Sequence, residues 1–394
     1  MASANKSKTA VLIFVAPQDG TGGVGDYAEH VLADIRGMFD EVHEIRTRAP
    51  EEDSLKDIRR WRRELRRLER RFGVQNTVVH AELASGAVGP FWVLRASRSA
   101  RRSAIIHDAP YPVWWPLHTR EVVSAMHSSW RFNIWYGRFE RRILGGFLRR
   151  LERTMLRGVS VTALSGIGAE KISGVLGGTP VLAGRHYVPS ADIAGVVPVV
   201  KRPLAVGLFG HVYGGKGFEL LTRLRVEIPD EIEIRVAGRG TEALESMRGV
   251  TIIGTVDGTE ERDFFNSIRA LVLPYNRLHG KTPVYPASGA AARAFSFHTP
   301  VVSSRAGTFI EAAHEGGLLS VGEVDPVSNV VDVAALAAAT VELIGDESRL
   351  EALRNEVVDL AKRRTISGSL EPLVARWSTW IGEIHDGNGS RGGR

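Results

Sequence analysis

The sequence predicts an α/β protein with two doubly wound domains, each a parallel sheet covered by helices on both faces. Apolar runs of strand length alternate with amphipathic runs of helical length, which is the pattern of parallel sheets buried on both faces. The alternation pauses at 189–202, where valine, proline and small residues form a linker-like segment. The chain has 394 residues, too many for one core of ordinary size, so we expect a domain on each side of this segment.

In the first half, short runs rich in valine and isoleucine predict strands, and longer runs with apolar residues at helical spacing predict helices. Strands are expected at 11–15, 41–45, 76–80, 103–107 and 159–165, with a closing segment at 180–184. Helices are expected at 26–36, 54–72, 91–94, 116–156 and 168–176. We therefore predict an N-terminal domain over residues 1–195.

The second half repeats this alternation and predicts a C-terminal domain over residues 203–368. Strands are expected at 204–209, 232–237, 250–253, 270–274, 300–303 and 318–321. Helices are expected at 218–225, 260–269, 288–297, 331–344 and 348–364. A last helix over 369–385 carries Trp377 and Trp380, and the polar, glycine-rich residues 386–394 predict a disordered tail.

Composition excludes several classes of protein. Hydrophobic residues make up 43 % and charged residues 24 % of the chain, which is ordinary for a globular protein. There is no cysteine, so a disulfide framework, a thiolate zinc site and a cysteine nucleophile are excluded. The first apolar run, 11–16, is too short for a signal peptide or a membrane span, and we expect a cytoplasmic protein.

The net charge of +6 comes mostly from arginine, and two explanations stay open. A GC-rich genome gives this bias without selection for a partner, whereas a basic surface would attract anions. The sequence contains no recognised nucleic-acid-binding module, and its arginines are not interleaved with a stacking platform. We therefore expect no nucleic-acid partner.

The stretch from Gly207 to Gly217, Gly-Leu-Phe-Gly-His-Val-Tyr-Gly-Gly-Lys-Gly, is the most informative segment of the chain. It joins a buried strand to a predicted helix that Lys216 and Gly217 open. Glycines let backbone N–H groups approach an anion, a helix N-terminus favours negative charge, and the lysine adds a full positive charge. The stretch predicts a phosphate site, although a plain glycine turn has the same pattern.

Three more features follow predicted strands, and each has a functional and a structural interpretation. The loop from Thr21 to Tyr27 contains three glycines that either allow close approach of a ligand or form a tight turn. His107, followed by an aspartate, either donates a hydrogen bond to a ligand or is a satisfied structural histidine. Arg239, which follows Gly238, either meets a base or phosphate or belongs to a simple turn.

A fifth feature is the segment that runs from Tyr275 to the helix predicted at 288–297. Ser288 and Gly289 begin that helix, so its N-terminus lies after a strand, as the lysine loop does. Two helix N-termini and one lysine can hold a diphosphate without a metal. The sequence has no Asp-x-Asp pair or histidine cluster with metal spacing, so we expect neither a metal nor another cofactor.

Taken together, the segments resemble the family-4 retaining glycosyltransferases, which have the GT-B fold of two Rossmann-like domains facing a central cleft. The resemblance covers nearly the whole chain. It is carried by Gly22-Gly-Val-Gly-Asp-Tyr-Ala28, Val78-Val-His80, Ile105-Ile-His-Asp108, Leu164-Ser165, the Gly207–Gly217 stretch, Val236-Ala-Gly238, Leu273-Pro-Tyr275, Ser288-Gly289, Thr299-Pro-Val-Val302 and Glu311.

The resemblance implies transfer of a sugar from a nucleotide diphosphate sugar to a glycan, lipid-linked or small-molecule acceptor, with retained configuration. His107 and Lys216 would be catalytic, with His107 orienting the sugar and Lys216 stabilising the leaving diphosphate. The implied donor-diphosphate residues are Gly23, His211, Gly215, Lys216, Ser288, Gly289 and Ala290. The implied base, ribose and sugar residues are Gly238, Arg239, Tyr275, Tyr285 and Arg293. The implied acceptor region contains Gly25, Asp26, Tyr27, Trp114 and Trp115.

The same resemblance places the donor on the C-terminal domain and the acceptor on the N-terminal domain. The last helix would cross back to the N-terminal domain, where Trp377 and Trp380 would anchor it. In this family the leaving phosphate is thought to assist deprotonation of the acceptor, so no dedicated carboxylate base is implied. The implied role is in polysaccharide or glycolipid biosynthesis.

The chain departs from the family at a pair of glutamates that normally precede the Thr-Pro-Val-Val strand. Counting back from Thr299 puts these positions at Tyr285 and Arg293. Arginine cannot accept the hydrogen bonds of a ribose. His211 also stands where an arginine is usual. The alternative is therefore a catalytically silent glycosyltransferase-like binding or partner protein.

The predicted helix 54–72 is amphipathic and basic. It contains eight arginines and Lys56, and its apolar residues repeat at helical spacing on one side. One interpretation is peripheral contact with an anionic membrane, the inner face of the cell membrane, through the residues from Arg59 to Arg71. The other is a surface helix whose apolar stripe packs on the sheet.

Overall fold

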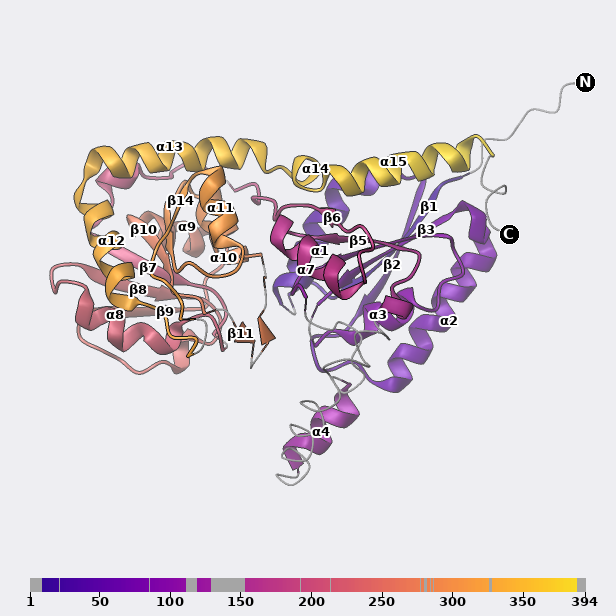
Figure 1. Ribbon diagram of the computed structural model, residues 1–394, viewed down its shortest axis with the longest axis horizontal. Helices are drawn as coiled ribbons and strands as arrows, with labels where there is room; N and C mark the ends of the chain where they lie inside the picture. The colour runs from indigo at the N-terminus through magenta and orange to yellow at the C-terminus, as the bar shows by residue number, and fades with distance from the viewer. Residues whose placement is uncertain are drawn as a thin grey trace, which may run out of the picture. The chain divides into compact units, whose positions relative to one another are not determined.

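The computed structural model divides the chain into two compact units (Figure 1). Unit 1 comprises Met1–Arg185 and Leu370–Arg394, and unit 2 comprises His186–Ser369. The described residues are 9–20, 22–84, 86–110, 119–128, 153–191, 193–212, 214–276, 278–279, 282–283, 285, 287–325 and 328–387. Among them, no helix combines the length and the apolarity that a bilayer crossing requires.

Unit 1 is built on a six-stranded parallel sheet in the order β2-β1-β3-β4-β5-β6. Its strands are β1 Val11–Pro17, β2 Glu41–Thr47, β3 Thr77–Leu83, β4 Arg101–Ile106, β5 Val159–Ala163 and β6 Leu182–Ala183. Its helices are α1 Gly23–Ile35, α2 Leu55–Phe72, α3 Val88–Leu94, α4 Arg120–Ser128, α7 Gly166–Val175 and α15 Glu371–His385.

Side chains alternate between the two faces of this sheet because successive residues of a strand point to opposite sides. Val79, Ala81 and Leu83 of β3 join the core under α2, α3 and α7. The intervening positions of β3, which include His80 and Glu82, therefore point to the other face. On that face the His80 ring contacts Phe14 of β1 and Trp377 of α15. Polar side chains are therefore buried on this face of the sheet.

Unit 2 is built on a second six-stranded parallel sheet, in the order β14-β13-β10-β7-β8-β9. Its strands are β7 Ala205–Phe209, β8 Glu233–Ala237, β9 Val250–Gly254, β10 Ala270–Leu273, β13 Val301–Ser303 and β14 Leu318–Ser320, and β11 Leu278–His279 pairs separately with β12 Thr282–Pro283. Its helices are α8 Leu221–Glu227, α9 Thr259–Asn266, α10 Gly289–Ser296, α11 Phe309–Glu315, α12 Val333–Gly345, α13 Glu347–Arg363 and α14 Ile366–Ser369.

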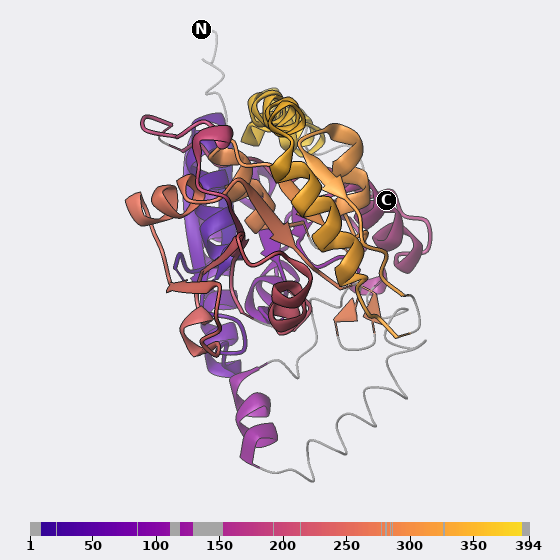
Figure 2. The ribbon, with the colours of Figure 1, turned by 90° about the vertical axis from the view of Figure 1, so that its left-hand side faces the viewer.

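Apolar side chains cover both faces of the unit 2 sheet. Val206 and Leu208 of β7 pack in one cluster with α8 and α12. Leu271 and Leu273 of β10 pack in the other with α9, α10, α11 and α13. The helices of both layers can be followed in Figure 1 and, from a second direction, in Figure 2. Such double coverage explains why the strands read as continuous apolar runs in the sequence.

The prediction of two doubly wound α/β domains is confirmed, and the differences are local. The helix predicted at 218–225 is present, but its first turn, Phe218–Leu220, is a 3₁₀ helix capped by Gly217 in a left-handed conformation, and α8 begins only at Leu221. Helix α11 was not predicted. Most of the helix predicted at 116–156, and residues 388–394 of the predicted tail, lie outside the described residues.

Candidate functional site

The lysine loop of unit 2 is fixed by close backbone packing at both of its ends. A Cβ on Gly238 would lie 2.1 Å from the carbonyl oxygen of Gly210, and a Cβ on Gly217 would lie 2.2 Å from that of Pro274. Both glycines also have positive φ angles, 124° and 79°, which other residues adopt at a cost. The glycines therefore bring the loops after β7, β8 and β10 together, whereas a Cβ on Gly214 would meet nothing within 4 Å.

Lys216 lies against Tyr275, the residue that the sequence placed in the base, ribose and sugar group. Its Nζ donates a hydrogen bond to the Tyr275 hydroxyl at 2.8 Å and lies 4.1 Å from the centre of the ring. A cation near the face of a tyrosine ring is attracted by the ring electrons. Tyr275 is 7 % exposed, so it holds the ammonium group in one place at the end of β10.

The start of α10 lies beside this pair. The Ser288 hydroxyl is 3.4 Å from the Tyr275 hydroxyl and accepts a hydrogen bond from the Ala291 N–H, which makes Ser288 the N-cap of α10. The first N–H groups of a helix have no partner within the helix. Those of Gly289 and Ala290 are therefore suited to an anion, and the structure brings Lys216, Tyr275 and Ser288 together as one cluster.

His186 is a neighbour of this cluster that the sequence reasoning missed. Its Nε2 lies 3.8 Å from the position that a Cβ on Gly289 would occupy, and its Nδ1 is bonded to the Tyr187 carbonyl at 2.7 Å. It follows β6 in the chain, and no motif in the sequence singles it out. His186 could therefore be recognised only from its position beside the start of α10 in the structure.

Arg293 and Arg239 do not join the cluster. Arg293, on α10, forms a two-bond ion pair with Glu261 of α9, which is 2 % exposed. Burial alone would lower the pKa of Arg293, but the hydrogen bonds and charge of Glu261 raise it above its usual value. Arg239 is exposed, His211 and Tyr285 are half-buried, and the backbone of the loop after β7 bonds to Arg239 through Val212.

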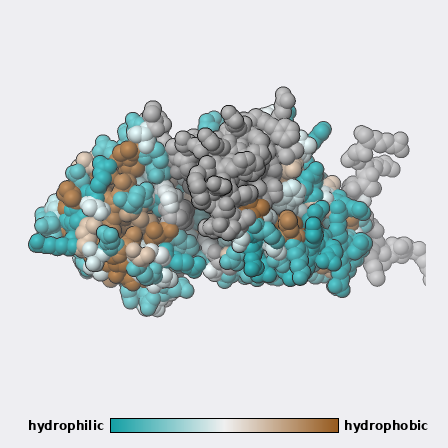
Figure 3. All heavy atoms as spheres, turned by 90° about the horizontal axis from the view of Figure 1, so that it is seen from below, coloured by the Kyte–Doolittle hydropathy of each residue, from teal (hydrophilic) through white to brown (hydrophobic). Residues whose placement is uncertain are grey.

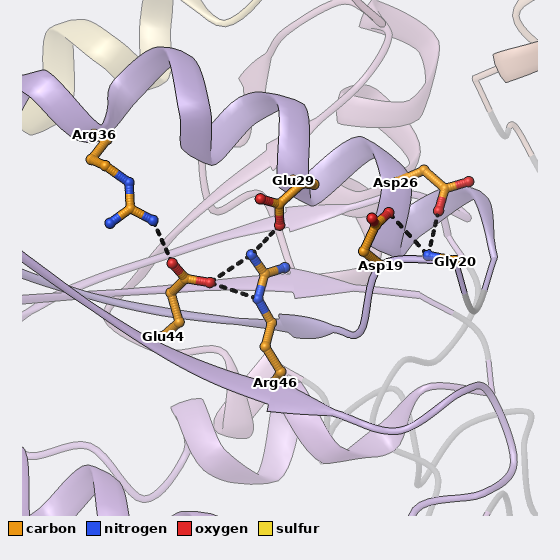
Figure 4. A network of polar contacts seen from close by, with 7 residues as sticks. All are labelled: Asp19, Gly20, Asp26, Glu29, Arg36, Glu44 and Arg46. Atoms are coloured by element: carbon orange, nitrogen blue, oxygen red, sulfur yellow. Dashed lines mark hydrogen bonds and ion pairs between the residues drawn. The ribbon is translucent and has the colours of Figure 1, made fainter. Parts of the chain in front are cut away.

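The glycine loop of unit 1 has one structural glycine and one open glycine. A Cβ on Gly25 would lie 2.1 Å from the carbonyl oxygen of Gln18, whereas a Cβ on Gly23 would meet nothing within 4 Å. The Gly20 N–H donates to both Asp19 and Asp26 at 2.9 Å, as Figure 4 shows. Gly25 and Asp26 therefore shape the loop, and Gly23 lies where a ligand could approach the backbone.

The same figure shows charged pairs that tie α1 to β2. Arg46 bonds Glu29 at 2.6 Å and Glu44 at 2.8 and 2.9 Å, and Arg36 pairs with Glu44 as well (Figure 4). Exposed pairs of this kind contribute little stability. They orient the helix that presents the loop.

His107 is held by a buried carboxylate that the sequence reasoning also missed. Its Nε2 is 2.8 Å from Glu82, and its ring packs nearly perpendicular to that of Tyr27, with centroids 4.7 Å apart. The other oxygen of Glu82 is 3.2 Å from Nε2 of His80. Burial alone would raise the pKa of Glu82, but hydrogen bonds from the two histidines hold it at about 2. His80 and Glu82 alternate in an apolar strand, a pattern that could have marked them.

The predicted acceptor residues are only partly described. Trp114 and Trp115 lie outside the described residues. Among the described residues, no group of three or more histidine, cysteine or acidic side chains could hold a metal ion. Metal independence stays a prediction.

Comparison with solved structures identifies the architecture. The chain is similar to sucrose-phosphate synthase from Thermosynechococcus elongatus, with 14 % identity, a TM-score of 0.64, and coverage of 96 % of this chain and 100 % of that one. The chain has the GT-B fold.

Two further GT-B structures align over nearly their whole length. HepE from Anabaena in complex with UDP-glucose has 13 % identity and a TM-score of 0.60, covering 94 % of this chain and 99 % of that one. A glycosyltransferase from Rickettsia africae has 11 % identity and a TM-score of 0.60, covering 95 % and 99 %. No family model matches the chain, and a search of curated proteins found no match. At these identities the likeness establishes the GT-B fold.

Proposed function

We propose that this GT-B protein is a retaining glycosyltransferase that moves a sugar from a nucleoside diphosphate sugar to a glycan, lipid-linked or small-molecule acceptor. The observation that carries the proposal is the cluster of Lys216, Tyr275 and Ser288 at the ends of parallel strands in unit 2. Ligands of open α/β sheets bind at the carboxyl ends of strands. HepE, which shares the fold, binds UDP-glucose.

The proposed chemistry follows from the charge that the reaction creates. As the glycosidic bond breaks, the departing nucleoside diphosphate gains negative charge. Lys216 and the N–H groups at the start of α10 would stabilise that charge more strongly in the transition state than in the ground state, which is what accelerates a reaction. His107 of unit 1 would hold the transferred sugar by a hydrogen bond.

Nucleotide binding tests the donor site before any acceptor is known. UDP, GDP and dTDP, each at a saturating concentration, should be compared by thermal unfolding. A ligand at 100 times its Kd stabilises the folded state by about 2.7 kcal/mol. We expect one nucleotide to raise the unfolding temperature of the wild type and to lose that effect in Lys216→Ala. The control is Lys201→Ala, an exposed lysine of the same unit, which should respond like the wild type.

Transfer assays with the corresponding nucleotide sugars then test catalysis. We expect hydrolysis or transfer from the donor whose nucleotide binds, with a loss of about 100-fold or more in Lys216→Ala. Activity should persist in a chelator, because the proposed clamp contains no metal. Absence of a shift with all three nucleotides would end the proposal.

One observation favours the second candidate function, a silent binding or partner protein. The ion pair of Arg293 with Glu261 occupies the position from which the resembled family binds the donor ribose. Nucleotide binding without hydrolysis or transfer, across the whole donor panel, would support this candidate over an active enzyme.

A finer proposal concerns the membrane. Ile58, Trp61 and Leu65 of α2 are buried in the unit 1 core, so the interpretation of this apolar stripe as a packing surface is confirmed. The arginines of α2 are exposed except Arg66, which is half-buried beside Glu69, and hydrophilic residues dominate the end of Figure 3 where α2 lies. Contact with an anionic membrane would therefore be electrostatic, through the arginines alone, and peripheral to the cell membrane's inner face.

A further inference from the structure

Polar side chains inside the unit 1 sheet form one connected chain that reaches from His107 to the C-terminal helix. His107 contacts Glu82 at 2.8 Å, Glu82 contacts His80 at 3.2 Å, and Nδ1 of His80 lies 2.9 Å from the Ser103 hydroxyl. Nε1 of Trp377, on α15, donates to the same hydroxyl at 2.9 Å. The exposed fraction is 8 % for His107 and 0 % for the other four residues.

The register of β3 and β4 explains why these residues meet. His80 pairs with Ser103 across the two strands, and Glu82 pairs with Ile105. Residues directly opposite or diagonal on one face of a sheet lie within side-chain reach. His107 follows Ile105 by two positions, so it returns to the face that holds His80 and Glu82.

Trp377 gives this chain of hydrogen bonds a direction. An indole N–H can only donate, so the Ser103 oxygen accepts from it. At the other end, the Glu82 carboxylate can only accept, so His80 donates its Nε2–H to Glu82 and its Nδ1 accepts from the Ser103 O–H. His107 donates its own Nε2–H to the second carboxylate oxygen. Each bond therefore points toward Glu82, and Nδ1 is the nitrogen that His107 retains for another partner.

We propose that Trp377, Ser103, His80 and Glu82 are positioning residues that fix the tautomer and ring orientation of His107. Glu82 sets which nitrogen His107 presents to the transferred sugar, and the C-terminal helix supports this arrangement through Trp377, Ser103 and His80. The proposal rests on the proposed function, because that function supplies the contact between His107 and the sugar. Only His107 would contact the sugar, so the four residues would affect the reaction through His107.

The residue types in this row of hydrogen bonds argue against a role in packing alone. A buried carboxylate with its hydrogen-bond partners is often no more stable than apolar residues of the same volume. The anchoring of α15 does not need the indole N–H, because Glu383 pairs with Arg101 at 3.1 Å and His385 with Asp40 at 2.9 Å. The ring contacts of Trp377 with Phe39 and His80 also need only an aromatic ring.

The test is histidine-selective ¹⁵N NMR, which reports which ring nitrogen carries a proton. The ring signals of His80 and His107 are assigned by His80→Gln and His107→Gln variants. We expect both rings to be protonated at Nε2 in the full chain. Trp377→Phe keeps the ring and removes the donor, so the Ser103 hydroxyl is free to turn and the Nδ1 signal of His80 should shift, while Glu82 keeps the proton on Nε2.

Glu82→Gln should have a larger effect. An amide can accept from one histidine but must donate to the other, so one of the two rings should reverse its tautomer. Ser103→Ala, a smaller change, is the second variant in case Glu82→Gln does not fold. The control is Trp380→Phe on the same helix, which should leave both ring spectra unchanged.

Activity then shows whether the tautomer matters to the reaction. We expect Trp377→Phe to lower kcat by about 3- to 10-fold through loss of one oriented hydrogen bond, with unchanged binding of the nucleoside diphosphate to unit 2. The proposal is overturned if the Nδ1 signal of His80 is the same in Trp377→Phe, Ser103→Ala and the wild type, if Glu82→Gln leaves both ring tautomers unchanged, or if His80 carries protons on both nitrogens. Altered tautomers in a protein that transfers no sugar from any donor would instead support the positioning chain and overturn the proposed function.

Discussion

The two units place their polar groups differently. In unit 1, His80, Glu82 and Ser103 lie within strands of the sheet and have no exposed surface. In unit 2, the apolar strands end before the polar cluster begins, and Lys216 and Ser288 lie in the loop after β7 and at the start of α10. Both sheets are six-stranded and parallel, so the fold does not dictate this difference.

The difference shows two ways of fixing a functional group. Unit 2 uses backbone geometry, since glycines with positive φ bring three loops together and a helix start supplies N–H groups. Unit 1 uses side chains, because a buried carboxylate orients a histidine at the end of a strand. The backbone arrangement in unit 2 depends on the absence of Cβ atoms, whereas the side-chain arrangement in unit 1 depends on charge. The first should therefore be disrupted by glycine substitutions and the second by changes of charge or pH.

The largest expected effect is at Arg293, a half-buried side chain of unit 2 that pairs with the buried Glu261. Arg293→Glu removes the partner of a buried Glu261 and adds a second carboxylate beside it. Breaking a buried pair costs about 3–5 kcal/mol, and we expect at least that loss in urea unfolding. The swap Glu261→Arg with Arg293→Glu should recover most of it, and failure to recover would show that the pair is not what the two positions require.

The next effect is a pair of glycine substitutions, one in each unit. Gly25→Ala and Gly238→Ala each place a Cβ 2.1 Å from a carbonyl oxygen, and overpacking of backbone against backbone should cost about 3 kcal/mol or more. Gly23→Ala and Gly214→Ala meet nothing within 4 Å and should stay within about 0.5 kcal/mol of the wild type in urea unfolding. Equal costs for a substitution and its control would contradict the packing argument.

Two buried carboxyl groups of unit 1, those of Asp53 and Glu82, should change the stability in opposite directions as pH falls. Burial raises the pKa of Asp53 from 3.8 to about 6, despite hydrogen bonds from the Arg48 and Gly89 N–H groups. The folded state therefore binds this proton more tightly than the unfolded state, and stability falls as pH rises from 3.8 to about 6, by about 3 kcal/mol in all. In Asp53→Asn the free energy of unfolding should vary less with pH over that interval. An unchanged slope would show that Asp53 is not the group that titrates there.

Glu82 should show the opposite dependence. Its pKa is held at about 2, below the ordinary 4.5, by the two histidines despite the opposing effect of burial. Its contribution to stability is therefore fully present above pH 4.5 and is lost as pH falls toward 2. Chemical unfolding of the wild type and Glu82→Gln over this range should converge at the acid end, and parallel curves would show that Glu82 is not a paired carboxylate.

The smallest expected effect concerns the surface rather than the interior. Arg63 and Arg67 of α2 are exposed, and each arginine near an anionic bilayer contributes about 1 kcal/mol. Arg63→Ala with Arg67→Ala should weaken co-sedimentation with anionic vesicles roughly 30-fold at low salt. Arg223→Ala with Arg248→Ala, exposed arginines of unit 2, is the control. Absence of wild-type binding at low salt would end the membrane proposal.

The sequence alone determined the alternation of strands and helices and the position of the lysine loop. These features are local, because apolar periodicity is read within one element and glycines mark their own turns. The alternative interpretations of the glycine loop could not be separated in sequence, and the structure assigns a different role to each glycine. Gly25 packs against Gln18, and Gly23 is open.

Only the tertiary structure decided which side chains meet. His80 and Glu82 are separated from Ser103 and His107 by more than twenty positions in the chain, and Trp377 is 274 positions from Ser103. Their contacts depend on strand register and on where the last helix packs, which no local pattern encodes. The position of Arg293 was likewise predictable by counting from Thr299, but its partner Glu261 lies on another helix and became visible only when α9 and α10 were packed together.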